Sequence, residues 1–341
     1  MRMRDFMKFL RKADRRAVLL FTAATLLVVC ALIVGAAVGS THISLSRVIS
    51  ALAGKGKEAD INIIRYVRLP RTLGGLFCGG ALALAGAVIQ SVLGNRLASP
   101  SVIGVNAGAG LFVTAACAVG LVGGWQLSLA AFFGAVVSTA AVSLGARKFG
   151  ASGGTVILIG VALNSLLGAL SDTVIALDPD VSIMNADFRI GGFSGISYPR
   201  LIPAAAIILL TAVVLILLAP QLEILTLGEA EARSLGSKTG LMSAAFLTLA
   251  ALLAGAAVSV CGMLSFVGLL VPHAVRKLSG GRMRYFLPLC ALFGGGFVSL
   301  CDTLSRVIFS PYEIPVGIIM AFLGAPFFLF ILLGRKRRGA L

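Results

Sequence analysis

Three acidic residues lie within or beside long apolar stretches of the sequence, where a carboxylate could bind a cation or carry a proton. They are Asp172, Asp302 and Glu313. An ionisable side chain inside a membrane is expensive to bury and is a functional candidate by default. Arg306 follows Asp302 by one helical turn, so for this residue we favour a structural ion pair over a proton carrier.

Motifs for bond-making chemistry, metal binding and nucleotide binding are missing from the sequence. No nucleophile–base pair or polar catalytic cluster is present, so we do not expect an enzyme. The six cysteines show no CxxC or Cys/His spacing, and His42 and His273 are far apart, so neither a metal site nor a cofactor is predicted. No GxxxxGK motif followed by Ser or Thr occurs; if ATP drives this protein, another chain binds it.

The composition indicates a protein dissolved in lipid. Of the 341 residues, 58% are hydrophobic and 12% charged, with a mean hydropathy of +1.02. Backbone groups in lipid need internal partners, so long apolar segments rich in Gly and Ala predict an all-α bundle. The net charge of +16 lies mostly at the ends of apolar segments, as membrane topology predicts, and we do not expect a nucleic-acid partner.

The apolar segments predict one polytopic membrane domain over residues 1–341. We interpret the first as an uncleaved helix, because it is long for a signal peptide. The segments are Ala17–Gly39, Leu73–Val92, Val102–Val122, Trp125–Leu144, Thr155–Ala176, Leu201–Ala219, Leu241–Val271, Tyr285–Ser305 and Val316–Leu333.

The segment Leu241–Val271 is too long for one crossing. At about 1.5 Å per residue it exceeds a hydrocarbon core of about 30 Å by roughly half. The termini, 1–16 and 335–341, are strongly basic and are predicted to be cytoplasmic, which requires an even number of crossings. We therefore predict that this segment turns and returns, giving ten helices and placing Gly228–Gly240 and Pro272–Gly281 on one side.

Several basic residues contradict the positive-inside rule, because they fall in predicted outer loops. Two explanations stay open from charge alone: contact with lipid phosphates, or an acidic partner that docks outside. The residues are Arg47, Lys55, Lys57, Arg65, Arg68, Arg71 and Arg306.

Five motifs in consistent order carry a resemblance that covers nearly all of the chain after the first helix. They are RLPRTLGGLFCGGALALAGAVIQSVLGNRLASPSVIGVNAGAG, GEAEARSLG, FVGLLVPHAVRKLSGG, CDTLSR and EIPVGIIMAFLGAPFF. Together they are similar to the permeases of ATP-driven (ABC) importers for ferric siderophores, haem and cobalamin. The resemblance implies a type II ABC importer permease fold with ten transmembrane helices. It also implies a dimer of such subunits in the cytoplasmic membrane, two ATPase subunits and an extracytoplasmic binding protein.

The resemblance also implies roles for particular residues. Outward arginines that would hold acidic residues of the binding protein match Arg68, Arg71 and Arg306; the ATPase-coupling loop matches Gly228, Glu229, Glu231, Ala232, Arg233, Leu235 and Gly236. The inner gate matches Asn95 and Leu97, with Gly153 and Gly154 at its second position. Arg96 stands where the family usually has proline, which adds a charge near that gate. Asp172 belongs to a helix that borders the translocation path in the family, and either faces the path or lies in the outer interfacial water.

Two function classes follow. The first is a passive permease subunit for a metal chelate, with a ferric siderophore favoured over haem and cobalamin. The second is an ion-coupled secondary transporter that uses Asp172, Asp302 and Glu313, for which helices broken at glycines would be suitable.

Overall fold

Helices account for the secondary structure of the chain wherever the computed structural model describes it, which is residues 3–39, 41, 43–148, 153–234, 236–280 and 282–336. In order they are α1 (Met3–Ala37), α2 (Leu45–Leu52), α3 (Glu58–Asn62), the π-helix η1 (Ile63–Arg68), α4 (Leu69–Val92), α5 (Val105–Ala118), α6 (Gly124–Lys148), α7 (Gly153–Leu177), α8 (Asp180–Met184), α9 (Ala186–Ile190), α10 (Tyr198–Leu217), α11 (Ala219–Leu225), α12 (Glu229–Ser234), α13 (Thr239–Cys261), α14 (Val267–Ser279), α15 (Met283–Ser305) and α16 (Val316–Lys336).

Seven spans among the described residues are long and apolar enough to cross a membrane. They lie in α1, the continuous run of α3, η1 and α4, then α6, α7, α10, α13 and α15, while α5 and α16 contribute shorter apolar helices. With α14 as a short returning helix, the described part of the bundle has the ten segments that parity predicted. The protein is therefore a polytopic α-helical membrane protein.

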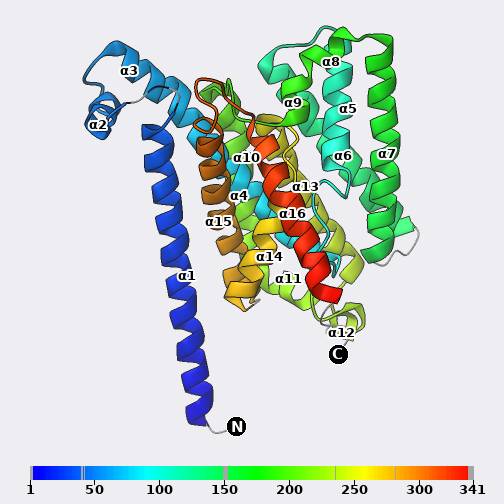
Figure 1. Ribbon diagram of the computed structural model, residues 1–341. Coiled ribbons are helices and arrows are strands. Elements are labelled where there is room, and N and C mark those ends of the chain that lie inside the picture. Colours follow the sequence, from blue (N-terminus) through cyan, green and yellow to red (C-terminus); the bar gives the residue numbers. More distant parts are fainter. Residues whose placement is uncertain are drawn as a thin grey trace.

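The predicted reversal after α13 is present. The helix ends at Cys261, and Gly262 has φ 69°, a conformation that L side chains rarely adopt. A Cβ at Gly262 would also lie 2.6 Å from the backbone oxygen of Phe188 in α9. The chain then re-enters the bundle as α14. Figure 1 shows α12, the end of α14, the start of α1 and the end of α16 at one end of the molecule. That end is called inner below, and the end with α2, α3 and α9 is called outer.

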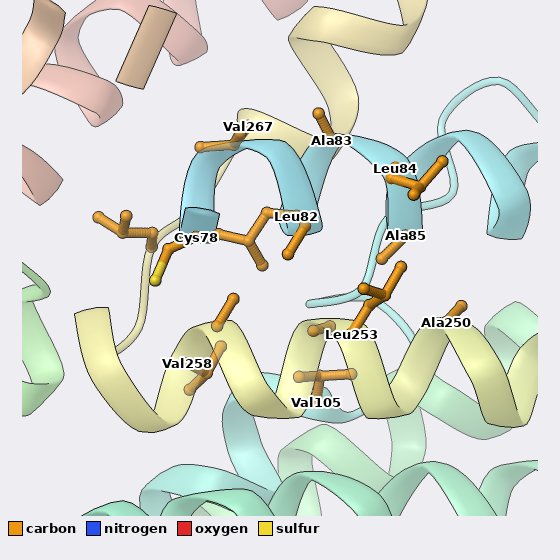
Figure 2. Packing of buried hydrophobic residues seen from close by; sticks show 14 of the residues in the cluster. Cys78, Leu82, Ala83, Leu84, Ala85, Val105, Ala250, Leu253, Val258 and Val267 are labelled. Carbon is orange, nitrogen blue, oxygen red and sulfur yellow. The ribbon is translucent and has the colours of Figure 1, made fainter. Parts of the chain in front are cut away.

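Helix α4 lies at the centre of the bundle. Its apolar span is 83% buried, whereas the spans of α1 and α7 are each only 11% buried and form the periphery. Cys78 and Leu82 of α4 pack against Leu253 and Val258 of α13 (Figure 2). α14 and α15 cover other sides of α4.

Glycines set the close approach of α4 to its neighbours. Gly79 faces Gly294 of α15, where an added Cβ would lie 2.5 Å from the Gly294 oxygen. Gly86 faces Gly268 of α14, and a Cβ there would overlap the Gly268 carbonyl. The small residues that the composition indicated therefore allow backbones to meet directly, as in other membrane bundles.

Candidate functional site

A buried cluster of charged residues joins three segments at the outer end of the bundle. Arg71, in the first turn of α4, donates from Nε to both carboxylate oxygens of Asp302 at 3.1 Å. Arg306 Nη2, at the end of α15, lies 2.8 Å from Asp302 Oδ2. The Asp302 side chain is 0% exposed. The i,i+4 pair expected from the sequence is thus present, and Arg71 adds a second cation.

The same cluster extends to the end of α1 and to the loop before α16. Arg306 Nη1 donates to Gly35 O at 3.2 Å, and Arg68 Nη1 donates to Ala36 O at 3.0 Å and Ala37 O at 2.7 Å. Cations at a helix C-terminus stabilise its exposed carbonyls and its dipole. Arg71 Nη1 lies 2.5 Å from Glu313 Oε2. We call Arg68, Arg71, Asp302, Arg306 and Glu313 the outer charge cluster.

The arginines expected to dock a partner are therefore brought together, but all three are buried and form internal bonds. Glu313 is the accessible member, with its side chain 34% exposed. The cluster holds three cations and two anions, so it keeps a positive excess. Each of these residues can be read from the sequence. Only the fold shows that the Glu313 carboxylate pairs with Nη1 of Arg71.

The predicted ATPase-coupling loop forms the short helix α12 at the inner end (Figure 1). Ala232 is fully buried against the bundle and Glu231 is exposed. Gly228 and Gly236 flank the helix with φ 115° and 79°, which lets the chain turn sharply into and out of it. Leu235 lies outside the described residues, and so do the side chains of Glu229 and Arg233.

The two predicted parts of the inner gate lie together. Asn95 Oδ1 accepts a hydrogen bond from Leu97 N at 2.9 Å, which shapes the turn after α4. Gly153, in the first turn of α7, packs so closely on the Leu93 carbonyl that a Cβ would overlap it, and Gly154 beside it is exposed.

Sequence reasoning missed Asn164, which anchors α7 further along the same face. Its Nδ2 donates to Ser101 O at 2.9 Å and to Val102 O at 3.2 Å, in the loop between α4 and α5. Gly160 packs on the Val102 carbonyl between these anchors. A lone amide in an apolar helix was the available signal. These contacts attach α7 to the loop that follows the predicted gate positions.

Asp172 lies on the exposed side of α7, with its side chain 72% exposed. Its oxygen Oδ1 lies 3.9 Å from Nη2 of Arg189 in α9, a partner that the sequence did not indicate.

His273 packs edge-on against Phe327, with ring centroids 6.0 Å apart, in keeping with a structural role. Within the described residues, no group of three or more His, Cys, Asp or Glu side chains could hold a metal ion.

The bundle of long apolar helices, with a buried charge cluster at one end and a short helix at the other, defines the class as polytopic α-helical membrane proteins. The chain belongs to the FecCD transport family, which matches residues 26–334. Its similarity to curated proteins extends over nearly the whole chain. It is 35% identical to the Fe(3+)-citrate import system permease protein YfmD of Bacillus subtilis, covering 96% of this chain and 97% of that one. It is 34% identical to the ferric enterobactin transport system permease protein FepD of Escherichia coli, covering 92% and 95%.

Comparison with solved structures agrees with the sequence relationships. The fold matches an inward-facing metal-chelate type ABC transporter with a TM-score of 0.82 and 29% identity, covering 93% of this chain and 99% of the other. The permease fold expected from the sequence motifs is thus confirmed.

Proposed function

We propose that this chain is the permease subunit of an ATP-driven importer that moves a metal chelate, with a ferric siderophore favoured as cargo, across the cytoplasmic membrane. The observation that carries the proposal is the end-to-end similarity to permeases of ferric-chelate import systems. In this proposal both termini and α12 face the cytoplasm, and the outer charge cluster faces the side from which the chelate arrives.

The inner end supports an ATPase contact. α12 packs against α11 and α13, and it presents Glu231 to solvent while Ala232 anchors it. A short helix held in this way can seat in a groove of a soluble partner. ATP-dependent closure of two ATPase subunits would then move α12 and, through α13, the bundle. The driving force comes from an affinity for nucleotide that differs between the two states.

The outer charge cluster supports docking of a binding protein by exchange of carboxylates. Arginine suits carboxylate recognition because its planar fork donates two parallel hydrogen bonds. In the permease without its partner, the Glu313 carboxylate pairs with Nη1 of Arg71. An acidic side chain of the binding protein would displace Glu313 there, while Asp302 keeps Arg71 and Arg306 in place. The docking role predicted for the arginines is thus concentrated on Arg71, with Glu313 as an internal competitor.

Pairing with a second copy is part of the proposal. The span of α7 is almost uncovered within one chain, and its exposed face carries Leu158, Leu166 and Leu170. A second subunit against this face would place Asp172 and the gate glycines of α7 beside a shared translocation path.

Ion-coupled secondary transport is the weaker alternative. Asp302 is fully buried and its carboxylate is bonded to two guanidinium groups, so it is already committed to structural ion pairs. Asp172 and Glu313 each face an arginine as well. Each of the three acidic residues on which this alternative depends therefore has an arginine beside it.

The test is uptake by proteoliposomes that contain the permease with its ATPase and binding protein, using ferric siderophores, ferric citrate, haem and corrinoids as candidate cargo. We expect accumulation of a ferric chelate only when ATP is present on the side of the membrane where the ATPase subunits bind. The matched control carries an ATPase whose nucleotide-binding lysine is replaced, and it should not accumulate cargo. Uptake by the permease alone under a proton or sodium gradient would overturn the proposal.

A further inference from the structure

The basic residues of the first outer loop divide into two groups. Arg47 bonds Asp60, Arg65 Nη2 donates to Leu52 O at 2.6 Å, and Arg68 and Arg71 belong to the outer charge cluster. Lys55 and Lys57 are exposed and have no ion-pair partner among the described residues. The positive charge that contradicts the positive-inside rule therefore serves the internal structure, except at these two lysines. Glu58 is the exposed acid beside them.

The lysines belong to a small folded unit made of α2 and α3, which we call the outer hairpin. It shares a small apolar core with the end of α1, in which Ile43, Val48 and Ala51 pack with Ala36 of α1 and Ile64 of η1. A two-point ion pair closes it, with Arg47 Nε 2.8 Å from Asp60 Oδ2 and Arg47 Nη2 2.7 Å from Asp60 Oδ1. The hairpin is thus a fixed structure that presents a defined surface.

Two large apolar side chains of α2 are left outside that core. Ile49 is 61% exposed and Leu52 is 42% exposed, and they lie three residues apart on one face of the helix. Val48 and Ala51, beside them on the same apolar face, are buried. α2 therefore has one apolar face, of which the hairpin core covers one side and leaves Ile49 and Leu52 uncovered.

The position of the hairpin identifies what covers this face. Figure 1 shows α2 and α3 projecting beyond α1, on the far side of α1 from α15 and from α5–α7. α2 lies level with the outer end of α1, and α3 lies further out. The span of α1 is 11% buried, with Val29 and Ile33 exposed along it. An exposed apolar surface of this kind on α1 suits contact with lipid, and the outer end of α1, with which α2 is level, then falls near the headgroups.

We propose that the outer hairpin is a lateral membrane anchor, in which Ile49 and Leu52 insert into the outer leaflet and Lys55 and Lys57 bind the phosphates of anionic phospholipids. An apolar patch flanked by lysines is the arrangement by which short amphipathic elements bind the interface. The anchor holds the hairpin flat, and η1 and α4 continue directly from it. The anchor therefore fixes the height of the α4 end that carries Arg71 relative to the bilayer surface.

The experiment uses the single tryptophan as a depth probe. Trp125 is replaced by phenylalanine, and one new tryptophan is introduced in the full chain in nanodiscs of brominated phosphatidylglycerol. Ile49→Trp should be quenched by the brominated chains and protected from aqueous acrylamide. Val29→Trp on α1 is the positive control, and Ala59→Trp on α3, which lies further out, is the negative control.

Each other outcome overturns the anchor. Quenching of Ile49→Trp by acrylamide alone would place α2 in water. Protection from both quenchers would show that protein covers it, either a second copy or a docked partner. Each variant's elution as a single species and its unfolding temperature establish that it is folded before it is scored.

The lysines are tested separately by lipid preference. In the Ile49→Trp background, quenching should be several-fold stronger in brominated phosphatidylglycerol than in the brominated phosphatidylcholine equivalent. Changing Lys55 and Lys57 to Gln should abolish this preference while leaving the fold intact, because both side chains are exposed. The matched control changes Lys238, exposed at the inner end, to Gln. An unchanged preference in the Lys55/Lys57 variant would refute the headgroup contact.

Discussion

Arg71 and Asp302 are 231 positions apart in the sequence, yet Arg71 Nε lies 3.1 Å from both carboxylate oxygens of Asp302. This contact joins the beginning of α4 to the end of α15 at the outer end of the bundle. Around it, Arg306 completes the pairing of Asp302, and Glu313 completes that of Arg71. The cluster therefore ties the outer ends of α4 and α15 to each other and to the loop before α16.

Neutralising Asp302 should be costly. Asp302→Asn leaves the buried guanidinium groups of Arg71 and Arg306 without their shared counter-charge, and breaking such a pair costs roughly 3–5 kcal/mol. We expect a clear fall in the unfolding temperature of the detergent-solubilised protein. Asp172→Asn is the matched control, since Asp172 is 72% exposed and exposed substitutions usually change stability by within about 0.5 kcal/mol. Equal unfolding temperatures for the two variants would contradict the structural role of Asp302.

Glu313 offers a direct test of carboxylate exchange. Glu313→Gln removes the internal competitor for Arg71, so the binding protein should bind more tightly, by about tenfold if roughly 1.4 kcal/mol of competition is removed. Arg71→Lys should weaken binding, because lysine lacks the planar fork. Charge reversal at Arg306 is uninformative here, because a glutamate there would be buried beside Asp302. The measurement is the dissociation constant of the binding protein from the permease in nanodiscs; unchanged affinity in Glu313→Gln rules out exchange.

The contact of Gly86 with Gly268 should tolerate no side chain. Gly86→Ala places a methyl group on the Gly268 carbonyl, and overpacking of this kind costs typically about 1–3 kcal/mol. The readouts are the yield of monodisperse protein and its unfolding temperature. Gly168→Ala, also within a helix but with nothing within 4 Å of the added Cβ, should be neutral or slightly stabilising, because alanine favours the helix. If both substitutions behave alike, close packing of α4 on α14 is not essential.

The exposed side of α12 should control association with the ATPase. Glu231→Lys reverses a charge on the surface proposed to seat in the partner and should reduce co-purification of the ATPase and permease-stimulated ATP hydrolysis by about tenfold or more. Glu223→Lys makes the same change on an exposed position of α11, outside α12. It should have a much smaller effect. An equal loss in both variants would indicate general electrostatic attraction to the inner end and not a specific seat on α12.

The amino-acid sequence by itself determined the fold class, the number of crossings and the family. Hydrophobic length is a local property, since each apolar segment must match the bilayer thickness wherever it lies in the sequence. For the same reason the excess length of Leu241–Val271 was sufficient to predict a reversal within it, which the structure locates at Gly262. The pair of Asp302 with Arg306 was also predictable, because residues one turn apart share a helix face.

Only the tertiary structure decided which partners the charged side chains have and which of them remain exposed. The arginines expected to face a partner are buried because contacts between distant segments, such as Arg71 with Asp302 and Glu313, depend on how α4, α15 and the following loop pack. The pairing of Asp172 with Arg189, and the placement of Ile49 beyond α1, likewise depend on helix packing. Sequence patterns report the period and length of each helix, but the rotation of one helix against another is set by side-chain and glycine contacts over the whole bundle.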